Sequence, residues 1–193
     1  MYAFISGKLS EITPTYAIVD NHGIGYFINI TVNTYSQIKN LKEVKLFTHL
    51  AVRDDAHVLY GFAQENERQL FQMLITVSGV GTNTARLILS SLTTDEAYTA
   101  ITSGNALILQ SVKGIGGKTA QRIVIDLKDK LSKQEIQIEK INVSHNTLKD
   151  EALSGLLILG FNKSAADKAL NRILKQTDID SVEKLIKEAL KIL

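Results

Sequence analysis

The fold is decided by residues 74–92, LITVSGVGTNTARLILSSL, and by their echo at residues 109–127, LQSVKGIGGKTAQRIVIDL. The two stretches lie 35 residues apart and share the pattern apolar-x-x-apolar-x-Gly-apolar-Gly-x-x-x-Ala, followed by an amphipathic run. This pattern is typical of a helix, a tight hairpin and a second helix, and its repetition indicates two copies of one unit. Residues 64–131 are therefore predicted to form an all-α tandem helix-hairpin-helix domain.

The paired glycines of each copy suggest a binding chemistry. Glycine lets the backbone turn where a Cβ would clash, so that successive N–H groups at the start of the second helix point outward. Together with the helix dipole, these groups make a cradle for a phosphate. Contacts of this kind hold a nucleic-acid backbone and read no bases. The residues expected to bind DNA in this way are Gly79, Val80, Gly81, Asn83 and Thr84 in the first copy, and Gly114, Ile115, Gly116, Gly117, Lys118 and Thr119 in the second.

Basic side chains follow the second cradle. Lys118 and Arg122 are four residues apart and so share a helix face, and both are expected to contact phosphate, whereas Arg86 has no such neighbour and is the weaker candidate. The alternative for all three is an ordinary solvated face. Gly116-Gly117-Lys118-Thr119 resembles the end of a P-loop, but the glycine required five residues before Gly117 is replaced by Val112. We therefore expect no nucleotide site and no cofactor.

N-terminal to the predicted helical domain, residues 1–63 carry five short runs rich in β-branched and aromatic residues, separated by turn residues. Five strands with a short polar insert at 33–40 predict a small β-barrel of the OB kind. The strands are expected at Ala3–Leu9, Tyr16–Val19, Ile24–Ile30, Val44–Val52 and His57–Phe62. Asp54 and Asp55 fall at the turn between the last two strands, where acidic residues are normally only turn formers.

Toward the C-terminus, residues 132–146 are polar, with Ile136, Ile138, Ile141 and Val143 near alternation, and we interpret them as a linker. An extended segment packed on a neighbour is the alternative. Residues 147–193 are predicted to form a three-helix bundle, with Gly160 at the C′ position of its first helix. The predicted fold class is thus a multidomain α+β protein.

Composition excludes several classes of function. Twenty-two Lys and Arg against twenty Asp and Glu leave a net charge of +2, which argues against a polybasic, histone-like mode of DNA binding. Cysteine is absent and the four His are scattered, so neither a disulfide framework nor a metal site is expected. The charge-free stretch 21–38 is polar throughout, and residues 1–7 lack a basic region. We therefore expect no membrane span, no signal peptide and a cytoplasmic location.

Three groups of residues carry a resemblance to a known family. They are Val52–Phe62, which reads VRDDAHVLYGF, the two Gly-apolar-Gly hairpins, and Ala152–Leu157 with Leu159-Gly160-Phe161. With the order barrel, two hairpin units and three-helix tail, the chain closely resembles the RuvA family, the Holliday-junction-binding subunits of the bacterial branch-migration machine. The resemblance covers nearly all of the 193 residues and extends to a C-terminal bundle of the UBA-like kind.

The resemblance implies a role in DNA recombination and repair. Family members form a homotetramer, also as paired tetramers, whose concave face holds an open four-way junction without sequence dependence. By resemblance, Asp54 and Asp55 form an acidic pin at the crossover, and Arg53 beside them binds DNA. The hexameric ATPase RuvB is recruited through the C-terminal bundle, at Leu156, Leu159, Gly160 and Phe161. The resolvase RuvC is a further partner, and the subunit itself has no catalytic residues.

Two departures from the family pattern affect the expected affinity. The family often has Lys where this chain has Asn83 and Gly117, which should weaken binding and flatten its salt dependence. The alternative function is a helix-hairpin-helix accessory domain of a nuclease or polymerase that binds duplex DNA without choosing junctions. A metal-dependent nuclease would need clustered carboxylates, and Asp54-Asp55 is the only such pair in the barrel, without a third ligand nearby.

Overall fold

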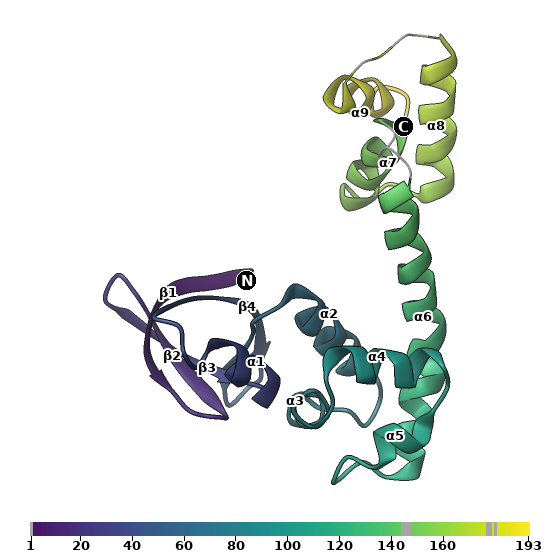
Figure 1. The fold of residues 1–193 in the computed structure, drawn as a ribbon. Coiled ribbons are helices and arrows are strands. Elements are labelled where there is room, and N and C mark those ends of the chain that lie inside the picture. The colour runs from purple at the N-terminus through teal and green to yellow at the C-terminus, as the bar shows by residue number, and fades with distance from the viewer. Residues whose placement is uncertain (1, 144–147, 177–178, 180) are drawn as a thin grey trace. The chain divides into compact units, whose positions relative to one another are not determined.

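The computed structural model describes residues 2–143, 148–176, 179 and 181–193, and the chain divides into two compact units, residues 1–133 and 134–193 (Figure 1). The first unit holds the predicted barrel and tandem hairpins, and the second holds the three helices of the tail. Among the helices of the described residues, none is long and apolar enough to span a membrane.

The N-terminal segment forms a closed five-stranded barrel. Its strands are β1 (Phe4–Ile12), β2 (Tyr16–Asn21), β3 (Ile24–Ile30), β4 (Glu43–Val52) and β5 (His57–Phe62), with helix α1 (Val32–Ile38) between β3 and β4. The order around the barrel is β1-β2-β3-β5-β4, and only the β3–β5 pair is parallel. Alternation along the strands fills the interior with apolar side chains such as Val19, Ile28 and Leu46, all fully buried. The predicted barrel is confirmed.

Five helices follow: α2 (Glu65–Leu74), α3 (Thr82–Ser91), α4 (Thr94–Thr102), α5 (Ala106–Gln110) and α6 (Gly117–Val143). Helices α2 and α3 flank the first hairpin, and α5 and α6 flank the second. Their apolar faces share one core with Tyr60 and Phe62 of the barrel strand β5. Because that core takes side chains from both parts, the barrel and the hairpins form a single packed unit.

Buried polar contacts also fasten the barrel to the helices. The carboxylate of Glu67 on α2 is 1% exposed and accepts hydrogen bonds from the hydroxyls of Thr31 and Thr34 at 2.5 and 2.9 Å. Burial raises the pKa of Glu67, while the two hydroxyl bonds oppose that rise. Arg86 of α3 donates to Asn29 Oδ1 of the barrel at 2.9 Å. These contacts hold the first hairpin unit against the barrel.

The segment interpreted as a linker, residues 132–146, is helical over residues 132–143. Helix α6 continues through it as far as Val143, and residues 144–146 lie outside the described residues. The near-alternation of Ile and Val favours an extended chain, but the intervening Lys, Gln and Glu are strong helix formers and the stretch lacks Gly and Pro. The helix that begins at the second hairpin therefore has no breaker to end it there. The division between the two compact units falls inside this helix, after Lys133.

The second unit is the three-helix tail, with α7 (Leu148–Ile158), α8 (Lys163–Gln176) and α9 (Val182–Leu190). Leu156, Leu170 and Leu185, one from each helix, are fully buried in its core. Gly160 follows α7 with φ of 94°, a left-handed conformation that suits glycine, as predicted. The bundle therefore has an apolar core of its own.

Candidate nucleic-acid interface

The two hairpins repeat one another in conformation as well as in sequence. Gly79 and Gly114 have φ of 87° and 90°, the left-handed region in which glycine is favoured. The turn is closed by Val80 N–H donating to Val77 O at 3.0 Å, and in the second copy by Ile115 N–H donating to Val112 O at 3.0 Å. These four apolar side chains are buried. Val80 and Ile115, expected to bind DNA, can therefore offer only their backbones to a ligand.

Each hairpin leads into a helix whose first N–H groups lack helical acceptors. The first helical bonds run from Ala85 N–H to Gly81 O and from Ala120 N–H to Gly116 O, both at 2.9 Å. The N–H groups of residues 82–84 and 117–119 precede these bonds and have no helical carbonyl to reach. Gly81 offers no side-chain cap, and the first turns TNTA and GKTA carry no acidic residue. Both helix ends are thus positively polarised and suited to an anion.

The second glycine of each hairpin has a different role from the first. A Cβ built on Gly81 or Gly116 would meet no heavy atom within 4 Å among the described residues, and neither glycine has a positive φ. The prediction that both glycines of each pair are needed for the turn is supported at Gly79 and Gly114 by their left-handed conformation and is wrong for Gly81 and Gly116. Their lack of a side chain leaves the surface open to whatever approaches the helix end.

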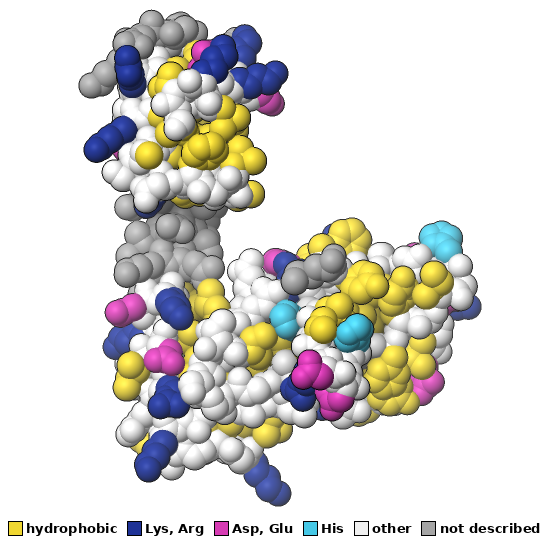
Figure 2. Space-filling model, turned by 180° about the vertical axis from the view of Figure 1, so that it is seen from behind, with side chains coloured by type: hydrophobic (Ala, Val, Ile, Leu, Met, Phe, Trp, Pro, Cys, Tyr) yellow, Lys and Arg dark blue, Asp and Glu magenta, His cyan; other side chains and the backbone are white. Residues whose placement is uncertain are grey.

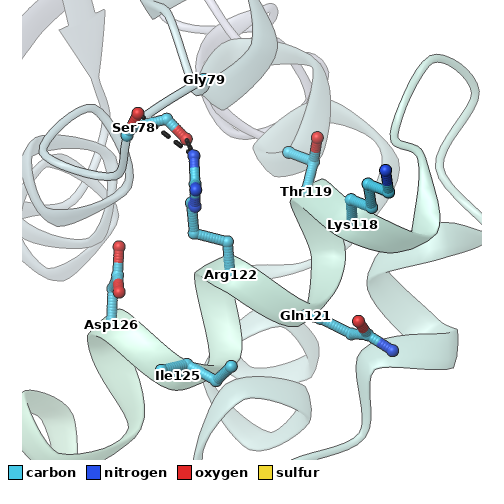
Figure 3. A pocket seen from close by; sticks show the side chains of 8 residues that line it. All are labelled: Ser78, Gly79, Lys118, Thr119, Gln121, Arg122, Ile125 and Asp126. Atoms are coloured by element: carbon cyan, nitrogen blue, oxygen red, sulfur yellow. Dashed lines mark hydrogen bonds between the residues drawn. The ribbon is translucent and has the colours of Figure 1, made fainter.

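A hollow lies between the first hairpin and the start of α6 (Figure 3). Lys118 and Arg122 both line it, so they share a face as predicted. Arg122 reaches across to the first hairpin, where its Nη1 donates to Ser78 Oγ at 3.2 Å and to Ser78 O at 3.4 Å. Lys118 is exposed on the first turn of α6, next to Thr119. The remaining lining residues are Gly79, Gln121, Ile125 and Asp126.

The acidic pair Asp54-Asp55 occupies the tip of the β4–β5 hairpin. Both residues are exposed, and the turn is closed by Arg53 N–H donating to Ala56 O at 2.9 Å. The Nη2 atom of Arg53 donates to Thr82 Oγ1 at 3.1 Å, at the first residue of α3. The structure therefore ties the acidic tip to the helix that the first hairpin precedes.

Three side-chain contacts near the first hairpin could not be predicted from the sequence pattern. Arg86, considered a weak phosphate candidate, bonds to the barrel instead. Ser78 and Thr82 were not singled out, although a signal exists in the repeat, where Thr82 stands opposite Gly117 and Ser78 opposite Lys113. Such differences between copies mark positions at which one copy makes a contact of its own.

The remaining candidates are in the tail. Leu156 is fully buried in the bundle core, and Phe161 packs partly against it. Leu159 is 59% exposed, next to Ile158 at 86%.

Elsewhere, basic side chains are spread singly over the face seen in Figure 2, consistent with the small net charge. Among the described residues, no three His, Asp or Glu side chains gather where they could hold a metal ion.

Comparison with known proteins identifies the family. Residues 1–61 match the RuvA N-terminal domain, residues 71–129 a SAM-like helix-hairpin-helix tandem, and residues 147–193 the RuvA C-terminal domain. Relatives named Holliday junction branch migration complex subunit RuvA include those of Christiangramia forsetii, 49% identical over 191 residues and 99% of each chain, and Flavobacterium psychrophilum, 46% identical over 192 residues and 99% of each chain. That of Cytophaga hutchinsonii is 44% identical over 198 residues and 100% of each chain. The resemblance inferred from the sequence is confirmed, and the chain belongs to the RuvA family.

Proposed function

We propose that this chain is the subunit of a branch migration complex that binds a four-way DNA junction and keeps it open. The observation that carries the proposal is the pair of matching hairpins, each ending in a helix start with open glycines, next to an acidic tip. The relatives' names point to the same role, since each is called a Holliday junction branch migration complex subunit.

Binding affinity comes from the hairpins. The N–H groups at the starts of α3 and α6 each take a phosphate oxygen, and the open space at Gly81 and Gly116 lets the backbone of the DNA come close. Lys118 adds a positive charge at the second cradle. These contacts involve phosphates only, so binding is independent of sequence and weakens with salt.

Selectivity for a junction comes from repulsion at the acidic tip. Asp54 and Asp55 are exposed at the end of a hairpin that lies beside the first cradle. Each carboxylate repels a phosphate 4 Å away by about 1 kcal/mol in water. Continuous duplex would bring phosphates close to the tip, whereas an open crossover leaves a space for it. Repulsion of the wrong ligand, added to general affinity, yields specificity.

A homotetramer supplies one copy of this surface for each arm of the junction. Exposed apolar side chains on the barrel support such an assembly, and hydrophobic side chains gather on the barrel face in Figure 2. The exposed apolar side chains of the barrel strands and their N-terminal approach include Tyr2, Phe4, Ile24 and Phe27. Paired tetramers and the resolvase RuvC complete the proposed set of partners.

The C-terminal bundle recruits the RuvB motor, and ATP hydrolysis belongs to that partner. Leu159, with its neighbours Leu157 and Ile158, offers an exposed apolar surface at the C-terminal end of α7. Leu156 supports this surface from the core rather than touching the partner, and Gly160 and Phe161 shape the turn behind it. We propose that the chain by itself has no catalytic residues and no cofactor.

The test is a gel-shift comparison of a four-way junction with a linear duplex of equal length. We expect at least about tenfold tighter binding of the junction, a difference of about 1.4 kcal/mol, for any arm sequence. Junctions of unrelated arm sequences are the control. Equal affinity for both DNAs would refute the proposal and favour a non-specific accessory domain.

A further inference from the structure

The acidic tip is weakly held by its own hairpin. Val52 pairs with His57 as the last register pair of β4 and β5, and the turn beyond it is closed by two backbone bonds between Arg53 and Ala56, at 2.9 and 3.4 Å. Residues 52–55 are exposed, so they gain little from packing. Two strands projecting from a sheet keep their direction poorly unless something else supports them.

That support comes from the hydroxyl of Thr82. Its oxygen accepts from Arg53 Nη2 at 3.1 Å and from the Tyr60 hydroxyl at 2.9 Å, which uses both of its lone pairs. Thr82 is 8% exposed and Tyr60 is 4% exposed. The barrel strand β5 thus fixes Thr82 through Tyr60, and Thr82 fixes the base of the tip through Arg53.

The same hydroxyl lies at the start of the first cradle. Thr82 is the first residue of α3, and the free N–H groups of the cradle begin with it. In the second copy the corresponding residue is Gly117, which has no hydroxyl. The acceptor is therefore present only in the copy that lies beside the tip.

We propose that Arg53 and Thr82 are a positioning pair that sets the distance from the acidic tip to the first cradle and thereby the preference for junctions over duplex. This inference rests on the proposed function. Repulsion falls with distance and is screened over about 10 Å at 0.1 M salt, so a tip that swings by a few ångströms loses much of its effect on phosphates held at the cradle. Arg53 acts through Thr82 and neutralises no phosphate.

The experiment measures junction and duplex affinities across a salt series for the full-length chain and its variants. Thr82→Val removes the acceptor of the bonds from both Arg53 and Tyr60, and we expect the junction-to-duplex affinity ratio to fall by about threefold to tenfold. The slope of log K against log salt should not change, because no phosphate contact is lost. Thr82→Ser should restore the ratio. Tyr60→Phe is the comparison variant: it removes the bond that fixes Thr82 to β5 and keeps the bond from Arg53, so the ratio should fall less than in Thr82→Val.

Arg53→Ala separates positioning from phosphate binding. A phosphate ligand would lower the salt slope by about 0.9, whereas we expect an unchanged slope and a reduced ratio. In the Thr82→Val background, Arg53→Ala should have no further effect, because the two residues act as a unit. Arg53 is exposed, so the Arg53→Ala variant should fold even if Thr82→Val does not. In that case the salt slope and the junction-to-duplex ratio of Arg53→Ala by themselves test the positioning role.

A lower slope for Arg53→Ala, or an unchanged ratio in the variants, would overturn the positioning role while the wild-type chain still prefers junctions. Absence of that preference in the wild-type chain would refute the proposed function itself.

Discussion

Adding a methyl group to the second glycine of each hairpin should abolish much of the DNA binding while leaving the fold intact. The double variant Gly81→Ala, Gly116→Ala tests this, because a Cβ at either position meets no heavy atom within 4 Å among the described residues. The matched control is Gly79→Ala, at a residue with φ of 87°. The control forces alanine into the left-handed region, and the double variant does not.

The structure sets different magnitudes for the two changes. Alanine at Gly81 costs up to about 1 kcal/mol as a poorer N-cap, and it recovers about 0.4–1 kcal/mol by restricting the unfolded chain. The unfolding free energy should therefore change by less than about 1 kcal/mol per site. Alanine at Gly79 should cost about 1–2 kcal/mol and lower Tm by several degrees.

The expected loss of binding is larger. A phosphate oxygen accepts from N–H at about 2.9 Å, and a methyl group beside the helix start holds the phosphate beyond that distance. Hydrogen bonds to charged groups contribute about 1.5–3 kcal/mol each, so losing one per hairpin weakens binding by about tenfold to a hundredfold at each site.

Thermal melting and junction gel shifts on the same samples provide the assay. The reasoning predicts a normal Tm with poor binding for the double variant, and a lowered Tm for Gly79→Ala. Wild-type affinity in a folded Gly81→Ala, Gly116→Ala protein would refute the idea that these glycines exist for the approach of a phosphate.

Four further outcomes are expected. Replacing Asp54 and Asp55 by Asn should raise duplex affinity and leave junction affinity equal or higher, and unchanged duplex binding in gel shifts would mean that both only form the turn. Lys118→Ala should lower the salt slope of junction binding by about 0.9, the value for one neutralised phosphate, and an unchanged slope would place Lys118 in solvent. A truncated protein of residues 1–145 should bind junctions nearly as well as the full chain, since both hairpins and the acidic tip precede the cut. It should fail to stimulate RuvB-driven branch migration, and full stimulation would contradict the role given to the tail. Burial raises the pKa of Glu67, so the folded state binds this proton more tightly than the unfolded state, and the unfolding free energy should fall as pH rises from the ordinary glutamate value through the raised one. Urea titrations across that range should show the fall in wild type and its absence in Glu67→Gln, and parallel profiles would exclude this contribution.

Local patterns in the sequence were sufficient for the barrel, the hairpins and the tail. Strand and helix periodicities reflect burial within each element, and the glycines at 79 and 114 reflect a left-handed backbone conformation that favours glycine. Repetition strengthened the prediction, because two copies of one motif rarely share both glycines by chance. The extent of α6 was missed, since residues 132–146 were interpreted as a linker, whereas their helix-forming residues continue the helix to Val143.

Which side chains hold the site together depends instead on tertiary packing. Arg53 bonds to Thr82, Arg122 to Ser78 and Arg86 to Asn29, and in each pair the partners belong to different elements of the fold. A sequence marks an arginine as a charge but does not say whether that charge faces a phosphate or a neighbouring segment. The answer depends on how the barrel and the helices pack, because a hydrogen bond requires its partners within about 3 Å and distant segments reach that separation only through the shared core.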